Sequence, residues 1–338
     1  MMIPIHYPCL GLDVAKAKLD ACLLLDGHKH HATFDNSQPG MRKLLAWVRK
    51  LHPEPLHRAV MESTGPYGEL AAAILHEAGH RVSVVNPRWI RDHARSLGRR
   101  NKTDRLDAQL IADYARTHDC DQWLPPAPEL ATLRGLLRRL ASIDSMIQAE
   151  QRRDECALSR EPMLLQSLRR VKRALVAEQK LLEKAIASHL REHPLLRDEC
   201  SLLQQIPGIG PKAARWLCAE LPRHLHSSRA AAAWVGVTPC KHESGSSVRD
   251  PSTIGREGNR HLRRVLYMPA VVARHKNPRL KSFADRLETN RKPKMVVLFA
   301  VLHKLVRIAF SILKNHSLYD PLHSPFPLST PLLDTDGI

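Results

Sequence analysis

The first 85 residues alternate between short strand-like runs and stretches with helical spacing. Residues 9–14 form an apolar run interrupted by a single acid, and a second run covers residues 19–25. Asp26-Gly27 is a tight-turn signal that leads into a third run at residues 30–34. Helices and strands are then expected in alternation at residues 41–51, 58–61, 70–78 and 82–85. This order predicts an α/β fold, a mixed sheet covered by helices.

Beyond residue 124 the pattern changes from strands to long helices. Prolines at 125, 126 and 128 indicate a boundary, and Arg160-Glu161-Pro162 breaks the helical spacing that follows. We expect two long helices whose apolar stripes are buried in an antiparallel hairpin or in a coiled coil between subunits, as in a dimer. The stripes are Leu130, Leu133, Leu137, Leu140, Ile143 and Ile147, then Leu164, Leu168, Val171, Leu175, Leu182 and Ile186.

These patterns divide the chain of 338 residues into four segments. We expect an α/β domain at residues 1–124 and a coiled-coil segment for spacing and assembly at residues 125–198. A mainly α-helical domain at residues 199–316 follows, and a flexible, proline-containing tail at residues 317–338 ends the chain. The length is sufficient for two domains with cores of their own.

The net charge of +18 is the strongest global signal. Such an excess of cations repels itself unless a polyanion neutralises it, which favours nucleic acid over a membrane as the partner. No run of 18 apolar residues and no secretion signal is present, so we expect no membrane span. The seven cysteines are scattered, and none has zinc-ligand spacing, which indicates reduced thiols in the cytoplasm.

Four carboxylates occupy particular places on the predicted α/β domain. Asp13 lies within the first strand, Glu62 closes the strand before Ser63, and Asp104 and Asp107 share one face of a predicted helix. Oxygen ligands that converge from two strands and one helix suit Mg²⁺. Each residue also has an ordinary interpretation: Asp13 exposed at a sheet edge, Glu62 as a cap, and Asp104 complementing a helix dipole.

A basic strip directly precedes the last two carboxylates. It would hold a phosphate backbone near the metal, although an ordinary solvated helix face gives the same pattern. Its cations are Arg88, Arg91, Arg95, Arg99, Arg100, Lys102 and Arg105.

Residues 202–212 resemble the turn of a helix-hairpin-helix motif. Gly208 and Gly210 would let backbone amides approach a phosphate at the start of the next helix, where Lys212 adds charge. The alternative is a tight turn between two helices with no ligand.

A polar loop at residues 242–249 contains three serines beside Arg249. Ser244, Ser246 and Ser247 are all candidate nucleophiles toward a phosphate, and a plain surface loop is the alternative. A predicted helix after the loop places further cations beside it, namely Arg260, Arg263 and Arg264.

The chain resembles the IS-one-ten family of insertion-sequence transposases, also called bridge-RNA-guided recombinases. The resemblance covers residues 9–315 in order. The matching motifs are Gly-Leu-Asp-Val-Ala-Lys at 11–16, Met-Glu-Ser-Thr-Gly at 61–65, Asn-Pro at 86–87, Asn-Lys-Thr-Asp-Arg-Leu-Asp-Ala at 101–108, Ile-Pro-Gly-Ile-Gly at 206–210, Glu-Ser-Gly-Ser-Ser-Val-Arg at 243–249 and Leu-Arg-Arg-Val-Leu-Tyr-Met-Pro-Ala at 262–270.

The resemblance implies a RuvC-like, ribonuclease-H-type N-terminal domain, a coiled-coil middle and a C-terminal transposase domain with a nucleophilic serine. The Asp-Glu-Asp-Asp metal site maps onto Asp13, Glu62, Asp104 and Asp107, and the nucleophile maps onto Ser244. It further implies Mg²⁺ or Mn²⁺, donor and target DNA, a noncoding bridge RNA, and dimers that assemble into a tetramer. The expected location is the bacterial cytoplasm, associated with the nucleoid.

Two other functions fit parts of the same sequence. One is a RuvC-like endonuclease or junction resolvase that uses metal-activated water and forms no covalent serine intermediate. The other is a nucleic-acid-binding protein without catalytic activity, for which the carboxylates would be dispensable. A Ser244→Ala variant separates the first alternative from the transposase, and Asp13→Ala separates the second.

Overall fold

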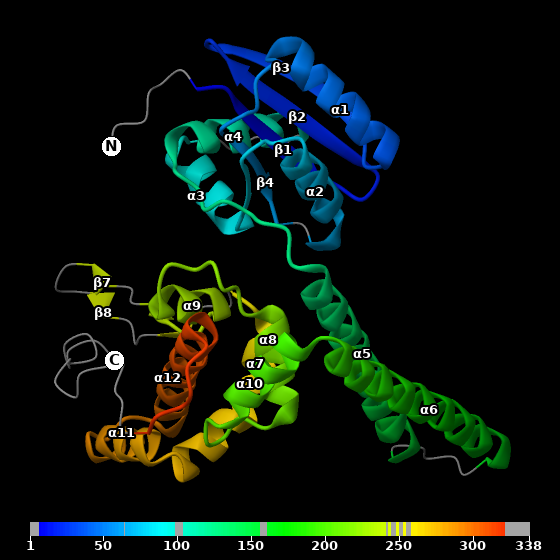
Figure 1. Cartoon of the computed structure of the whole chain (residues 1–338), viewed down its shortest axis with the longest axis vertical. Coiled ribbons are helices and arrows are strands. Elements are labelled where there is room, and N and C mark those ends of the chain that lie inside the picture. The colour runs from blue at the N-terminus through cyan, green and yellow to red at the C-terminus, as the bar shows by residue number, and fades with distance from the viewer. Residues whose placement is uncertain are drawn as a thin grey trace. The chain divides into compact units, whose positions relative to one another are not determined.

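The computed structural model describes residues 7–63, 65–98, 104–155, 161–240, 243–244, 248–249, 253–254 and 258–321 (Figure 1). The chain forms two compact units, Met1–Pro126 and Ala127–Ile338. The first is a mixed α/β unit around a five-stranded sheet and the second is largely helical, as the sequence predicts. The finer domain boundaries at residues 124, 198 and 316 stay predictions.

The sheet of the first unit has the strand order β3-β2-β1-β4-β5. Its first three strands form an antiparallel meander, while β4 pairs parallel to β1 and β5 pairs parallel to β4. Asp26 and Gly27 adopt left-handed φ angles of 47° and 82°, which confirms the tight turn between β2 and β3. The strands are β1 (Cys9–Val14), β2 (Lys18–Leu25), β3 (His28–Asp35), β4 (Ala59–Glu62) and β5 (Val82–Val85).

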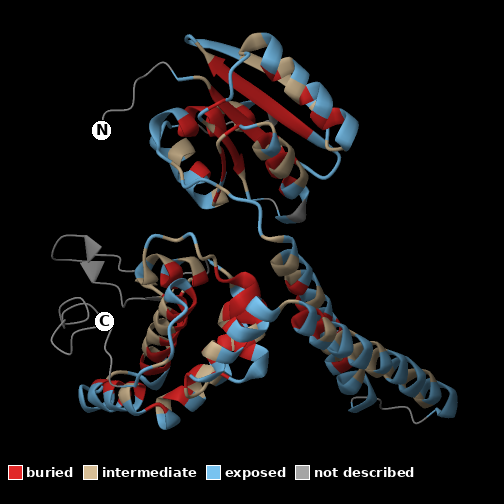
Figure 2. Cartoon of the chain, viewed as in Figure 1, coloured by how far each residue is buried: buried red, intermediate tan, exposed pale blue. Residues whose placement is uncertain are grey.

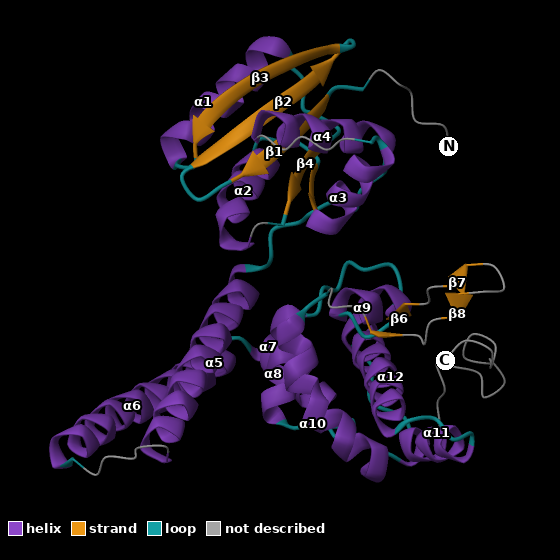
Figure 3. Ribbon diagram, turned by 180° about the vertical axis from the view of Figure 1, so that it is seen from behind, coloured by secondary structure: helices purple, strands orange, loops and turns teal. Residues whose placement is uncertain are grey.

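Helices cover both faces of this sheet (Figures 1 and 3). On one face, α1 (Gln38–Leu51) and α2 (Glu69–Glu77) share a core with Leu10, Leu12 and Met61. On the other face, α3 (Pro87–Ser96) and α4 (Asp104–Thr117) share a core with Cys9 and Val60. Alternate strand residues therefore point to opposite helical layers. A short 3₁₀ turn, η1 (Gly65–Gly68), follows β4.

The second unit begins with two long helices, α5 (Pro128–Glu155) and α6 (Pro162–Glu192). The Gln179 amide donates to Asp144 Oδ1 at 2.7 Å, and the His189 ring lies 2.8 Å from the Glu129 carbonyl oxygen. Since late residues of α6 meet early residues of α5, the pair forms an antiparallel hairpin. This confirms one of the two arrangements predicted for the apolar stripes.

Most of the remaining helices pack against α12 (Lys294–Asn315). Ten residues of α12 are buried; buried residues are red in Figure 2. By length and composition α12 could cross a membrane, but its apolar side chains lie in the core of the unit. The other helices are α7 (Pro194–Gln204), α8 (Pro211–Glu220), α9 (Ser228–Val235), α10 (Arg260–Lys276) and α11 (Pro278–Thr289).

Candidate functional site

Asp13 and Glu62 lie on neighbouring parallel strands at the same edge of the sheet. Leu12 of β1 pairs with Met61 of β4, so Asp13 and Glu62 come next on each strand. Strand alternation places both side chains on the face that α4 covers, which is also the face of Val60 and Gly11. Both carboxylates are partly exposed and both interact with neighbouring residues.

Helix α4 crosses this face in direct contact with β1. A Cβ atom at Gly11 would lie only 2.3 Å from the Ala108 carbonyl oxygen and 2.3 Å from the Ala112 amide nitrogen. Real Cβ contacts essentially never fall below 3.0 Å, so only glycine permits this approach. The contact fixes the distance between α4 and the strand that carries Asp13.

The direction of α4 determines where its carboxylates lie. The Arg58 guanidinium, just before β4, donates to the carbonyl oxygens of Ala115 and His118 at 2.6 and 3.1 Å. The C-terminal end of α4 thus lies at the edge where β4 begins. Its first turn, with Asp104 and Asp107, therefore points toward the opposite edge, where β1 and β4 end.

Carboxylate oxygens are the ligands that Mg²⁺ and Mn²⁺ prefer. Asp107 is partly buried on α4, and Asp104 begins that helix, but the Asp104 side chain lies outside the described part of the structure. Among the described side chains, no three His, Cys, Asp or Glu groups are close enough to hold a metal. The predicted metal-ligand roles of Asp13, Glu62, Asp104 and Asp107 thus stay predictions.

A fifth carboxylate, Asp20, lies directly opposite Asp13 in the β1–β2 register. It is only 9% exposed, the Thr33 hydroxyl donates to its Oδ1 at 2.6 Å, and Lys18 Nζ lies 3.2 Å from its Oδ2. Like charges directly opposite across two strands destabilise a sheet unless cations offset them. The sequence reading missed Asp20, because residues 15–18 carry no turn signal that would reveal this register.

The arginines predicted on α3 lie on its solvent-exposed side. Arg88, Arg91 and Arg95 are exposed, and Asp92 forms ion pairs with Arg88 and Arg95 at 3.3 and 3.2 Å. Trp89 stands among them with 52% of its surface exposed, an aromatic side chain that the sequence reading overlooked. Exposed aromatics beside cations are typical of surfaces on which bases stack. Arg99, Arg100 and Lys102 lie outside the described residues.

The candidate nucleophile lies on a ribbon between α9 and α10. Strand β6 (Pro239–Cys240) pairs with β9 (Thr253–Ile254), and between them β7 (Glu243–Ser244) pairs with β8 (Val248–Arg249) (Figure 3). Ser244 pairs with Val248. The side chains of Ser244 and Arg249 lie outside the described part, as do Ser246 and Ser247.

The two ends of this ribbon are clamped together at its base. A Cβ at Gly258 would lie 2.5 Å from the Gly236 amide nitrogen, so the two backbones are in contact. The Asn259 amide donates to the Trp234 carbonyl oxygen at 3.1 Å, and the Arg263 guanidinium donates to the Val235 carbonyl oxygen at 2.9 Å. The ribbon therefore starts and ends on one rigid platform formed by α9 and α10.

A buried carboxylate, Glu220 at the end of α8, holds this platform. Glu220 is 3% exposed and accepts hydrogen bonds from Arg138 at 2.8 and 3.2 Å and from the Asn259 side chain at 3.0 Å. Asn259 Oδ1 in turn caps α10 by accepting from two backbone amides of its first turn. Glu220 thereby fixes the helix start from which Arg260 and Arg264 project, exposed, while Arg263 contacts α9.

Replacing Glu220 by alanine is expected to lower the free energy of unfolding of the second unit by about 2 kcal/mol. The effect is smaller than for a fully buried ion pair, because Arg138 is half exposed and solvent screens its charge. The loss leaves Arg138 and Asn259 without their shared acceptor. Urea unfolding monitored by circular dichroism measures the change, with Glu183→Ala on the exposed face of α6 as the control. Equal midpoints for the two variants would contradict the structural role of Glu220.

Gly208 lies in the turn between α7 and α8 and packs against α10. Gly208 has φ of +107°, and a Cβ there would lie 2.7 Å from Ala273 Cβ on α10, so helix packing accounts for this glycine. Lys212 is exposed and lies 3.0 Å from Asp144 Oδ2 on α5. Its predicted contact with a phosphate would have to compete with this ion pair, and that contact stays a prediction.

A second group of cations gathers on α9, α11 and α12, and two of them, Lys304 and Arg307, belong to the basic terminal helix that the sequence predicts. Lys304 and Arg286 lie 4.5 and 5.6 Å from the centroid of the Phe283 ring, and Arg307 donates to the Ser228 hydroxyl at 3.3 Å. Burial and neighbouring arginines lower the pKa of Lys304 to about 8, and burial with Arg229 lowers the pKa of Arg307 to about 10. Such a concentration of positive charge attracts polyanions.

Comparison with known proteins matches both units to transposases. Residues 10–161 match a family model for transposases of the DEDD, IS110 type, and residues 200–285 match the model described as "Transposase IS116/IS110/IS902 family". The first match contains β1, β4 and α4, and the second contains the ribbon with Ser244.

Individual relatives cover most of the chain. The "Pilin gene-inverting protein" of Moraxella bovis is 31% identical over 92% of this chain and 97% of its own length. A "Probable family 20 transposase" of Pseudomonas aeruginosa is 25% identical over 92% of this chain and 98% of its own length. An insertion element IS110 protein of Streptomyces coelicolor is 25% identical over 80% of this chain and 56% of its own length. The chain therefore belongs to the IS110, or IS-one-ten, family of transposases, enzymes that recombine DNA.

Proposed function

We propose that this transposase exchanges DNA strands through a covalent phosphoserine intermediate at Ser244, assisted by a divalent cation and guided by a noncoding bridge RNA. The observation that carries the proposal is the placement of Asp13, Glu62 and the first turn of α4 at one edge of the sheet. Family membership along both units supports Ser244 as the nucleophile, ahead of Ser246 and Ser247.

A RuvC-like, ribonuclease-H-type fold is the proposed identity of the first unit. The strand order β3-β2-β1-β4-β5, with three antiparallel strands followed by two parallel ones, supports it. The carboxylates on β1, β4 and α4 then form one acidic edge. The chemistry of these oxygen donors fits Mg²⁺ or Mn²⁺.

In the proposed reaction, Ser244 Oγ attacks a DNA phosphorus. A new Oγ–P bond forms, the bond from phosphorus to the 3′ oxygen breaks, the serine loses its proton, and the leaving oxygen gains one to become a free 3′ hydroxyl. A cation held by Asp13, Glu62, Asp104 and Asp107 would polarise the phosphate and lower the pKa of the attacking hydroxyl. Arg249 and Arg263 would offset the negative charge that develops on the phosphate oxygens.

Return of the 3′ hydroxyl of another strand to the phosphoserine would complete the exchange without an external energy source. The exchange replaces one phosphoester bond with another, so the serine is regenerated at the end. The clamped base of the ribbon would keep Ser244 in place between the two steps. The printed name of the Moraxella relative, a gene-inverting protein, fits such an exchange between two sites in one DNA molecule.

The serine and the carboxylates belong to different units of the chain, so a composite active site is proposed, within one subunit or between two. The α5–α6 hairpin supports assembly, because it exposes large apolar side chains along α6. Met163 is 78% exposed and Leu181 is 61% exposed, and Leu164 and Val171 are each 43% exposed. A second copy of the hairpin would bury them in a coiled coil, which leads to the proposed dimer and tetramer.

Donor DNA, target DNA and bridge RNA are the proposed partners. The net charge of +18 and the exposed cations on α3 and α10 support nucleic acid as the ligand. Arg88, Arg91, Arg95, Arg99, Arg100, Lys102, Lys212, Arg249, Arg260, Arg263 and Arg264 are the proposed contacts. A protein with these partners would act in the cytoplasm, at the nucleoid.

Replacing Ser244 by alanine is expected to reduce recombination by about 10³-fold or more, because alanine lacks the hydroxyl that forms the covalent bond in the proposed reaction. A plasmid that carries the gene with its native flanking DNA reports recombination by PCR across the new junctions. DNA and RNA binding should persist in a gel-shift assay. Ser246→Ala and Ser247→Ala are the matched controls and should recombine.

Full cleavage of DNA by the Ser244→Ala variant would overturn the assignment of Ser244 as the nucleophile. That result would instead support a RuvC-like, metal-dependent endonuclease or junction resolvase.

A further inference from the structure

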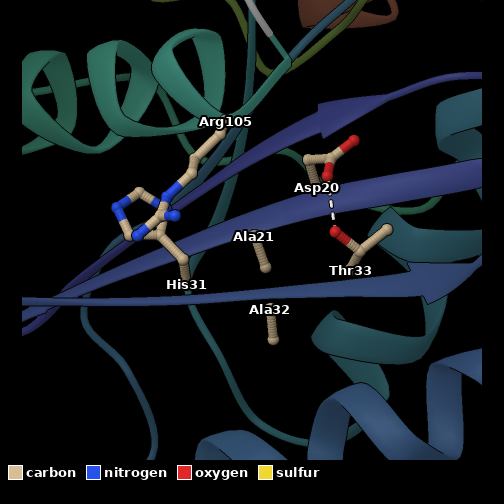
Figure 4. A pocket seen from close by; sticks show the side chains of 6 residues that line it. All are labelled: Asp20, Ala21, His31, Ala32, Thr33 and Arg105. Carbon is tan, nitrogen blue, oxygen red and sulfur yellow. Dashed lines mark hydrogen bonds between the residues drawn. The ribbon is translucent and has the colours of Figure 1, made fainter.

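A cavity of about 230 Å³ opens between α4 and the strands β2 and β3. Its walls come from β2, β3 and the first turn of α4 (Figure 4). A water molecule needs about 10–15 Å³ of accessible space in a cavity, so this one accommodates a phosphate with some of its hydration. The lining residues are Asp20, Ala21, His31, Ala32, Thr33 and Arg105.

Two hydrogen-bond donors converge in this cavity without an acceptor. Arg105 extends from α4 to the imidazole of His31 on β3 (Figure 4). No hydrogen bond or ion pair joins its guanidinium to any residue in the part of the chain that the structure describes, and the buried His31 Nδ1 has no hydrogen-bond partner there either. Arg105 is exposed to solvent, whereas a buried donor such as His31 Nδ1–H costs about 1–3 kcal/mol when it has no acceptor. Both groups would be satisfied by one anion.

The other ring nitrogen of His31 lies beside a thiol. Cys22 Sγ lies 3.8 Å from His31 Nε2, and burial raises the pKa of the Cys22 thiol to about 11. The protonated thiol can donate to Nε2, and the proton of the neutral ring then lies on Nδ1, which is the tautomer that a phosphate oxygen at Nδ1 favours. Burial and the adjacent Arg105 lower the pKa of His31, so the ring is neutral at neutral pH. Nδ1–H is a donor, which suits an oxygen acceptor.

Asp20, the acid in the cavity wall, does not accept hydrogen bonds from Arg105 or His31. Asp20 Oδ1 accepts from Thr33 at 2.6 Å and Oδ2 lies 3.2 Å from Lys18 Nζ, so its charge is largely compensated. Asp20 pairs with Asp13 across the strands, so the cavity lies one strand away from the candidate metal edge. An anion held there would be a near neighbour of a phosphate at that edge.

We propose that Arg105 and His31 form a binding site for a backbone phosphate of the DNA strand that is held at the acidic edge. Arg105 moves away from the His31 ring and binds two phosphate oxygens with its planar guanidinium. The Nδ1–H of His31 then donates to the same phosphate. The site holds the strand next to the phosphate that reacts. It rests on the proposed function, because it assumes that DNA reaches this edge.

The test measures binding of a fluorescent single-stranded DNA of 30 nucleotides by the full chain, as anisotropy against salt concentration. Chelator is present throughout, so neither metal nor Ser244 chemistry enters, and the result is independent of strand exchange. Arg105→Gln should weaken binding about tenfold and reduce the slope of log K against log salt by about 0.7, the value for one phosphate contact with a single strand. Arg105→Lys should keep most of the slope but lose part of the affinity.

Arg42→Gln is the matched control, since Arg42 is exposed on α1, which covers the opposite face of the sheet. His31→Phe keeps the ring and removes its donors. If both groups hold one phosphate, His31→Phe combined with Arg105→Gln should lose less affinity than the sum of the two single losses. Thermal unfolding of each variant verifies the fold.

Equal losses for Arg105→Gln and Arg42→Gln would overturn the site, because they would show only a general charge effect. Additive losses would overturn the shared phosphate. The same anisotropy measurements are repeated with an RNA oligonucleotide of the same sequence. Losses confined to RNA would overturn DNA as the ligand.

Discussion

Replacing Asp13 by asparagine is expected to reduce recombination by about 10³-fold or more while DNA binding is retained. Asparagine has the same shape but lacks the charge that a divalent cation requires from its ligands, and loss of one essential catalytic group costs rate factors of this order. Asp13 is partly exposed at the end of β1, so the fold should tolerate the exchange. Glu62→Gln, on the neighbouring strand, should have the same effect.

The measurement is the junction PCR on a plasmid with native flanking DNA, together with a gel-shift assay. Glu54→Gln is the matched control, because Glu54 is exposed between α1 and β4, before the strand rather than at its end. Chelation should abolish recombination by the wild type, and added Mg²⁺ or Mn²⁺ should restore it. An Asp13→Asn variant that recombines as well as Glu54→Gln would show that the acidic edge has no catalytic role.

Replacing Gly11 by alanine is expected to destabilise the first unit by about 3 kcal/mol. The added methyl would lie 2.3 Å from backbone atoms of Ala108 and Ala112, and a backbone cannot yield as a flexible side chain can. Helix α4 would have to move outward, which costs core packing and shifts Asp107 relative to Asp13. Recombination should fall along with stability, since the catalytic edge depends on that distance.

Gly135→Ala provides a control of opposite sign. Gly135 is exposed on α5, with nothing within 4 Å of an added Cβ, so alanine should stabilise its helix by about 0.5–1 kcal/mol. Urea unfolding followed by circular dichroism compares the midpoints of the two variants with that of the wild type. A Gly11→Ala midpoint at or above the wild-type value would contradict the close contact between α4 and β1.

Much of the fold follows from local signals in the sequence. The Asp26-Gly27 turn specifies the β2–β3 hairpin, and three-four spacing specifies α5 and α6. The positions of Glu62 at the end of β4 and Asp107 on α4 were likewise predictable from strand ends and helix spacing. These features depend on a few consecutive residues, which is why they can be derived without tertiary structure.

Contacts between distant residues could not be derived in the same way. The role of Gly11 depends on α4, about a hundred residues later, and the clamp of Gly258 on Gly236 depends on how α9 meets α10. Asp20 lies opposite Asp13 only because of the β1–β2 register. Lys212 was predicted from its motif, but its ion pair with Asp144 on α5 has no sequence signal. Packing of separate elements decides all of these features.

The covalent link between Ser244 and DNA is the central claim, and mapping that link tests it most directly. Wild-type protein is incubated with DNA that carries the element ends, guide RNA and Mg²⁺, then denatured, digested and sequenced by mass spectrometry. A nucleotide attached through phosphate to Ser244 is the predicted result, and it should be absent from Asp13→Asn. DNA cleaved without any adduct, or an adduct on Ser246 or Ser247, would contradict the account.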